Sequence, residues 1–179
     1  MEGKLLIAHP LLNDGFFNRS VIYVTSHSDE GAVGFTLNFK TQFLLKDVRA
    51  SIKNGNYPIY EGGPVARNQL FYLHTLGHDV PGAAEVGHNL FIGGEFEELL
   101  QLIEKRKVKS YDVRFFAGYC GWDANQLEGE IKRKHWLIAD PPDNGFFINE
   151  TNDLWGTQLQ QIKNSYSIFA NFGSDPSMN

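Results

Sequence analysis

The one cysteine of the chain lies where residue types and spacing could support nucleophilic chemistry. Cys120 stands between Gly118 and Gly121, after an apolar run and shortly before the sequence Asp-Ala-Asn-Gln. The pattern predicts a buried strand over 111–116, a glycine turn that holds Cys120, and a helix that begins after Asp123. This arrangement would place the thiol just before a helix N-terminus.

A thiol at a helix N-terminus can have a lowered pKa and act as a nucleophile. No histidine or aspartate adjoins Cys120 in the sequence, although His74 or His135 could approach it in the folded chain. The alternative is a small residue that fills a crowded corner, and we favour it because most free cysteines are buried and inert. Cys120 is therefore kept as a weak catalytic candidate.

Three glycine turns could hold an anion through their backbone amides. They contain Gly62 and Gly63, Gly93 and Gly94, and Gly118 and Gly121. None matches a P-loop or a GxGxxG fingerprint, and acidic residues follow the second and third turns. The first turn lacks such acids and has Arg67 nearby, so it is the best candidate for an anion site. Tight-turn geometry is the alternative that we favour at all three turns.

Arg19 and Asn38 are polar residues set among apolar ones, as is Asp14. They could form a buried network that fixes a loop, or they could line a ligand pocket. The network is favoured, because buried polar side chains more often satisfy backbone groups. Trp122, with Trp136, is expected in the core or at an interface between lobes.

Clustered metal ligands occur in one stretch, which contains His74, His78, Asp79 and His88. The first two histidines have the spacing of a helical turn, but the residues before His74 predict a strand and Gly77 intervenes. We therefore expect histidines that bond to neighbouring loop groups, and we expect no metal and no other cofactor.

The composition is typical of a packed, soluble domain. The 179 residues are 42% hydrophobic and carry a formal charge of −5, which argues against a dedicated nucleic-acid binder. We expect one domain over 1–173 and a loose tail over 174–179. The basic clusters at 105–109 and 132–135 each follow an acidic stretch, which favours helix C-termini. No segment has the length of a secretory signal or a membrane helix, so the expected compartment is the cytoplasm.

Hydrophobic periodicity and turn residues predict a chain of mixed strands and helices. The expected strands cover residues 5–8, 20–27, 33–37, 59–61, 69–74, 89–92, 111–116 and 136–139, with a further edge strand at 146–148. The expected helices cover 45–53, 95–105, 153–163 and a segment after Asp123, where Gln126 completes a capping box.

Several ordered motifs run along the chain. They are Gly3-x-Leu5-Leu6-Ile7-Ala8, Asp14-x-x-Phe17-x-Arg19-Ser20-Val21-Ile22-Tyr23, Glu30-Gly31-Ala32-x-Gly34-x-x-Leu37-Asn38, Tyr60-x-Gly62-Gly63-Pro64-Val65 and Leu73-His74. The most specific is Gly118-Tyr119-x-Gly121-Trp122-x-x-x-Gln126-Leu127-Glu128-x-Glu130-Ile131, with Trp136-Leu137 after it. In these motifs, and over about residues 3–155, the chain resembles the YqgE/AlgH family of bacterial proteins.

The resemblance implies an α+β fold, in which a bifurcated mixed β-sheet with a small closed β-barrel is surrounded by helices. It also implies a cytosolic protein whose activity is not established, although members are sometimes labelled transcriptional regulators. This chain departs from the family in having Phe39-Lys40 where Arg-Pro is common, and Asp123-Ala124-Asn125 where Gly-Pro-Gly is common. Relatives often have Ala or Ser at position 120, which weakens any role that demands a thiol.

Two functions from different classes remain. The first is a non-enzymatic binding or regulatory module that acts through a protein partner or a small ligand, whose identity and whose oligomeric context the sequence does not predict. The second is a hydrolase or group-transfer enzyme that uses Cys120 or a glycine-rich anion-binding loop. We favour the first, because no acid–base pair occurs at a known catalytic spacing. Direct binding to nucleic acid and to membranes is not expected.

Overall fold

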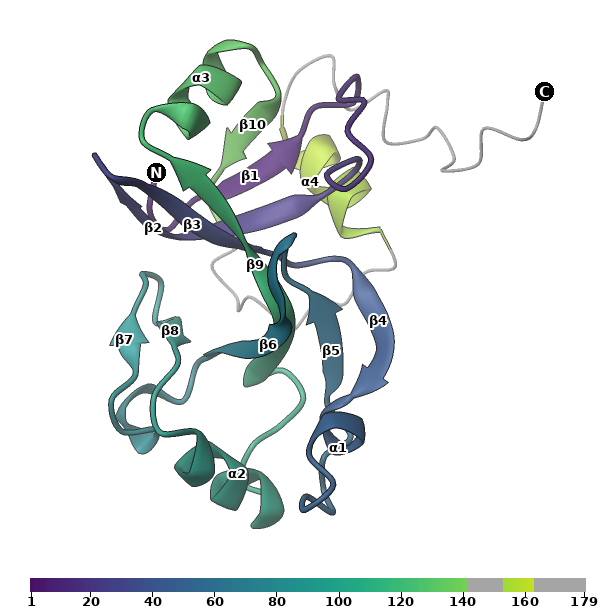
Figure 1. The fold of residues 1–179 in the computed structure, drawn as a ribbon, viewed down its shortest axis with the longest axis vertical. Coiled ribbons are helices and arrows are strands. Elements are labelled where there is room, and N and C mark those ends of the chain that lie inside the picture. Colours follow the sequence, from purple (N-terminus) through teal and green to yellow (C-terminus); the bar gives the residue numbers. More distant parts are fainter. Residues whose placement is uncertain (142–152, 163–179) are drawn as a thin grey trace, which may run out of the picture.

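The computed structural model describes residues 1–141 and 153–162 (Figure 1). The strands in this part of the chain are β1 (Leu5–Ala8), β2 (Val21–Ser28), β3 (Gly31–Thr36), β4 (Lys40–Leu44), β5 (Pro58–Glu61), β6 (Val65–His74), β7 (Ala84–Glu85), β8 (Phe91–Ile92), β9 (Val113–Asp123) and β10 (Trp136–Ala139). The α-helices are α1 (Leu45–Val48), α2 (Phe96–Glu104), α3 (Gln126–Lys132) and α4 (Leu154–Gln161), and a 3-10 turn, η1, covers Gly77–Asp79.

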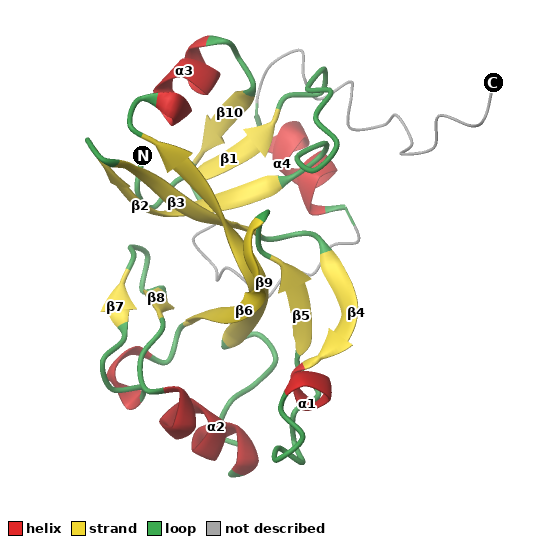
Figure 2. Cartoon of the chain, in the orientation of Figure 1, coloured by secondary structure: helices red, strands yellow, loops and turns green. Residues whose placement is uncertain are grey.

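The long strand β9 organises the sheet. Its C-terminal half pairs antiparallel with β3, and its N-terminal half pairs parallel with β5, whereas β6 runs antiparallel along it. The strand order β10-β1-β2-β3-β9-β6-β8-β7 therefore branches at β9 toward β5 and β4. Figure 2 shows the result, a curled sheet in the form of a half-barrel with helices around it. The α+β class and the bifurcated mixed sheet implied by the family resemblance are confirmed, and the small β-barrel that it also implied takes the form of this half-barrel.

Two apolar cores lie along β9. The first joins β1, β2 and β3 to the inward faces of α3 and α4, through residues that include Leu127, Trp155 and Leu159. The second joins β5 and the N-terminal half of β9 to α2, whose Leu99, Leu100 and Ile103 are buried at helical spacing. Phe115 and Phe116, adjacent on β9, contribute to different cores because successive side chains of a strand point to opposite faces.

The structure corrects the expected cysteine turn. β9 does not end at residue 116 but continues through Cys120 to Asp123, so the thiol lies inside a strand and not beside a helix N-terminus. Of the two glycines that predicted a turn, Gly118 lies where the backbone of β9 crosses that of Gly63. Gly118 has φ +73, and a Cβ on it would lie 2.6 Å from the carbonyl oxygen of Gly63.

Helix bounds differ from the expectation in two further places. Only Leu45–Val48 of the expected helix 45–53 is helical. α3 begins at Gln126 with Asn125 as N-cap, so Asp123 is not the cap, although the Gln126 side chain accepts the Asp123 N–H at 3.0 Å as in the expected capping box. β4 and β7 were not expected. The edge strand expected at 146–148 and the tail expected at 174–179 lie outside the described residues.

Candidate functional site

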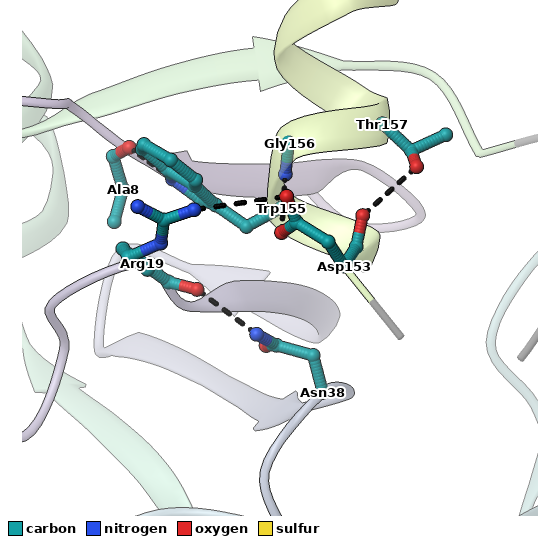
Figure 3. Close-up of polar contacts among 7 residues, drawn as sticks. All are labelled: Ala8, Arg19, Asn38, Asp153, Trp155, Gly156 and Thr157. Carbon is teal, nitrogen blue, oxygen red and sulfur yellow. Dashed lines mark hydrogen bonds and ion pairs between the residues drawn. The ribbon is translucent and has the colours of Figure 1, made fainter. Parts of the chain in front are cut away.

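Arg19 occupies a strained position at the end of the loop before β2. Its backbone is left-handed, with φ +58, a conformation that a non-glycine residue rarely adopts. The guanidinium carbon lies 4.2 Å from the centroid of the Trp155 ring, and Nη2 lies 3.6 Å from Oδ2 of Asp153 (Figure 3). With its side chain 24% exposed, Arg19 is a stacked, half-buried cation at the N-terminus of α4.

Asp153 and Trp155 hold the start of α4 on the sheet. Oδ1 of Asp153 accepts the N–H of Gly156 at 2.9 Å as a helix N-cap, and its carbonyl accepts the Thr157 hydroxyl at 2.8 Å. The indole N–H of Trp155 donates to the carbonyl of Ala8 in β1 at 2.8 Å. Figure 3 shows these bonds converging where Arg19 reaches α4.

Asn38 satisfies two backbone groups. Its Oδ1 accepts the Val21 N–H and its Nδ2 donates to the Arg19 carbonyl, both at 2.9 Å. Asp14 bonds within its own loop, where Oδ1 accepts the N–H groups of Phe16 and Phe17 at 3.0 Å. Arg19 and Asn38 therefore do meet, and Asn38 fixes the backbone that carries the guanidinium.

Gly62 and Gly63 lie directly against the backbone of β9. The Gly62 N–H donates to the Ala117 carbonyl at 2.9 Å, and its own carbonyl accepts the Thr36 N–H at 2.9 Å. A Cβ on Gly63 would stand 2.0 Å from the carbonyl carbon of Tyr119. Glycines are needed here because two backbone segments of the chain approach closely. This supports the tight-turn alternative over an anion site.

The remaining residues of the candidate anion site lie apart from the crossing. Arg67 is exposed and forms an ion pair with Glu61. Gly121 faces solvent on β9, where an added Cβ would lie 3.3 Å from the Tyr119 ring. The structure therefore brings together Gly62, Gly63 and Gly118, but it leaves Arg67 committed to a carboxylate.

Cys120 is sealed in the first core, with 1% of its surface exposed. Its thiol donates to the Gly62 carbonyl at 3.2 Å and lies 3.5 Å from the Thr36 hydroxyl. Burial raises the pKa of the Cys120 thiol to about 12, against the opposing effect of Thr36. A nucleophilic thiol needs exposure and a lowered pKa, and this position has the reverse of both.

The two histidines considered as partners for the thiol have other contacts. His74 is buried, with Nε2 3.0 Å from the Gly93 carbonyl and Nδ1 accepting the Leu76 N–H at 3.3 Å. Burial lowers the pKa of His74, partly offset by the Gly93 bond. The backbone of His135 accepts the N–H of His9 at 2.8 Å. Within residues 1–141 and 153–162, no group of metal-ligating side chains gathers around either histidine.

Trp122, expected from the sequence in the core or at an interface, is buried in the first core together with Trp136. Oε2 of Glu130 accepts the indole N–H of both Trp122, at 2.9 Å, and Trp136, at 2.7 Å. Gln126 donates to the other carboxylate oxygen at 3.0 Å, and the two indoles meet edge to face. One carboxylate thus ties α3 to β9 and β10.

The sequence pattern did not single out two residues of these contacts, Asp153 and Glu130. Asp153 precedes a helical run, which is the position of an N-cap, and that signal was available. Glu130 had no such signal, because only the fold brings the two tryptophans to one carboxylate. Among the described helices, none is long and apolar enough to cross a membrane.

Comparison with known proteins gives a consistent set of relatives. A family description of AlgH-like proteins matches residues 5–167. A UPF0301 protein of Bacteroides thetaiotaomicron is 37% identical over 99% of this chain and 91% of its own length. A UPF0301 protein of Chlorobaculum tepidum is also 37% identical, over 99% of this chain and 95% of its own.

Solved structures share the fold. The crystal structure of protein DIP2367 from Corynebacterium diphtheriae has a TM-score of 0.78 at 20% identity and covers 96% of this chain and 92% of its own. The solution structure of the AlgH protein from Pseudomonas aeruginosa has a TM-score of 0.74 at 24% identity and covers 97% and 94%. At such identities these structures support the fold alone. From the family match and the full-length relatives, the chain belongs to the AlgH-like family.

Proposed function

We propose that this protein is a non-enzymatic binding or regulatory module of the cytoplasm, which acts through a protein partner or a small ligand. The observation that carries the proposal is the position of Cys120. The one thiol of the chain is 1% exposed, bonded to a backbone carbonyl, and has a pKa raised to about 12. An enzyme that used this thiol would need it at the surface as a thiolate.

The other polar candidates support the same proposal. Asn38 and the glycines of the crossing satisfy or approach backbone groups, and Trp122 bonds to Glu130. Arg19 and Arg67 are the charged candidates that reach the surface, where they pair with Asp153 and Glu61, and an arginine can exchange such a carboxylate for one of a partner without chemistry. A regulatory role would then run through such contacts rather than through DNA, because the chain carries a formal charge of −5.

Alkylation of Cys120 tests whether its thiol is buried and unreactive. The rate of reaction with iodoacetamide is measured from pH 6 to 10, in buffer and in about 6 M guanidinium, with Cys120→Ala as the blank. We expect the native thiol to react orders of magnitude more slowly than the unfolded one, because it must first be exposed by opening of the core. Fast native alkylation with an apparent pKa below the ordinary value of about 8.5 would contradict the proposal.

A further inference from the structure

Two basic turns end helices in the same unusual way. After α2, the N–H of Arg106 bonds to Ile103 and that of Lys107 to Leu102; after α3, the N–H of Lys134 bonds to Ile131 and that of His135 to Glu130. Both are Schellman motifs, whose left-handed position is ordinarily glycine. Here that position holds Arg106, with φ +55, and Lys134, with φ +60.

We call the first the α2 turn (Lys105, Arg106, Lys107 and Lys109) and the second the α3 turn (Lys132, Arg133, Lys134 and His135). Figure 1 places α2 and α3 at opposite ends of the molecule. The lysines and arginines of both turns are exposed. None of them forms an ion pair with a residue of the described part of the chain. The favourable interaction of positive charge with a helix C-terminus accounts for some of these cations. It does not explain why Arg106 and Lys134 occupy the strained left-handed position.

The α3 turn has an apolar neighbour. The N–H of His9 donates to the His135 carbonyl at 2.8 Å, and the N–H of Leu11 donates to Nδ1 of His9 at 3.1 Å. Leu11 is thereby held beside the turn, and 73% of its surface is exposed, the largest exposure among the large hydrophobic residues described.

The charges of the α3 turn act on this neighbour. The pKa of His9 is lowered first by burial and then by Lys134 and His135. The His9 ring therefore lies in the positive field of the turn, next to Leu11. The α3 turn and Leu11 form one surface with clustered positive charge and a protruding apolar side chain.

We propose that the α3 turn with Leu11 docks an acidic segment of a partner protein, in which carboxylates meet Lys132, Arg133 and Lys134 and an apolar side chain packs on Leu11. Charge complementarity selects an anionic partner. Three permanent charges are few for a nucleic acid, whose binding rests on about six to ten phosphate contacts. The exposed Leu11 would pack against an apolar side chain, which a protein partner can supply. This inference rests on the proposed binding role and names the surface and the partner chemistry.

Fluorescence anisotropy with a synthetic peptide tests the proposal. The probe is a short labelled peptide of Asp and Glu with one central Leu, and its control has Asn and Gln in place of the acids. We expect the acidic peptide to bind, and its affinity to fall about tenfold with Lys134→Glu and several-fold with Leu11→Ser. Arg106→Glu is the matched control, since it makes the same charge reversal at the same backbone position of the α2 turn, and it should change affinity less than about twofold.

The proposal is overturned if Arg106→Glu and Lys134→Glu weaken binding equally, or if the amide peptide binds as well as the acidic one. It is also overturned if the acidic peptide does not bind, including the case in which vesicles of phosphatidylglycerol bind in its place. Thermal melts of the variants confirm that each is folded. Such failures would leave the binding role itself standing, because alkylation of Cys120 tests that role independently.

Discussion

Gly63 shows how closely two backbones can approach when one residue has no side chain. A Cβ at this position would lie 2.0 Å from the carbonyl carbon of Tyr119 and 2.3 Å from the amide nitrogen of Cys120. Both are backbone atoms of β9, so no side-chain rotation can relieve the contact. The crossing thereby positions Gly62, whose carbonyl accepts the buried thiol.

We expect Gly63→Ala to destabilise the fold by about 3 kcal/mol or more, because overpacking against backbone moves whole strands. Urea denaturation measures the change. Gly15→Ala is the control, since nothing lies within 4 Å of a Cβ at Gly15. A loss at Gly63 no larger than at Gly15 would show that the backbone at Gly63 does not approach β9 as described.

Lys134 allows a direct measurement of left-handed strain. Lys134→Gly and Lys134→Ala both remove the charge, but only glycine tolerates φ +60 without cost. We therefore expect the glycine variant to be more stable than the alanine variant by about 1 kcal/mol, measured by thermal unfolding. Equal stability of the two variants would mean that the α3 turn is not left-handed at this residue.

At the scale of elements, Glu130 joins three of them. Its carboxylate accepts both indole N–H groups and the Gln126 amide, so it links α3 to β9 and β10. We expect Glu130→Gln to destabilise the protein by about 1–3 kcal/mol, because the amide cannot accept as many bonds and leaves a donor unsatisfied. Chemical denaturation followed by tryptophan fluorescence measures this. Gln126→Ala, which removes one peripheral donor, should cost less; the reverse order would refute the central role of Glu130.

His74, at the end of β6, forms a pH-sensitive hydrogen bond with Gly93, which follows β8. His74 is buried and bonds to Gly93 through one ring nitrogen while it accepts the Leu76 N–H at the other, so the neutral ring fits and the charged ring does not. Its pKa is lowered in the folded state, so the unfolded chain takes up this proton more readily. The stability that depends on neutral His74 is present above the ordinary pKa of 6.5 and is lost as pH falls below it.

We therefore expect the melting temperature to decline as the pH is lowered from 7.5 to 5.5, a window in which few carboxylates titrate. His74→Gln keeps one donor and one acceptor, and it should flatten this dependence. His78→Gln, at an exposed histidine of the same loop, should leave it unchanged. A His74→Gln protein with the full wild-type dependence would contradict the assignment.

The elements differ in how far the sequence could predict them. β1, β2 and β10 are runs of apolar and β-branched residues, and α2 has its apolar positions at helical spacing, so local pattern sufficed. β9 was cut short because Gly118 and Gly121 resemble turn residues. Gly118 in fact allows a close approach to the backbone of Gly63 and Val65, more than fifty positions away, which no local pattern contains.

The same reason limits what the sequence revealed of the site. Arg19 and Asn38 could be predicted as a network because each is a polar residue in apolar surroundings. Their partner Asp153 is distant in the chain, and only the docking of α4 brings it to Arg19. Cys120 could be named from its type, but its inertness follows from a burial that depends on the whole sheet.

At the scale of the whole molecule, the part of the chain that the structure describes has two cores along β9, with the thiol, the indoles and His74 turned inward. The thiol, the indoles and the buried histidine all bond to neighbouring groups of the fold. What it presents outward is charge, in two basic turns at opposite ends of an otherwise acidic chain. This distribution supports the proposed binding role, in which surface charge recognises a partner.

Native mass spectrometry of the protein, purified gently from its own host, tests this account most directly. The account predicts a stoichiometric non-covalent complex, in which the partner or ligand keeps its mass on prolonged incubation and Cys120 carries no adduct. A bare chain under gentle conditions would contradict the binding role. A covalent adduct on Cys120, or a bound molecule that is converted to a product of different mass, would show an enzyme instead.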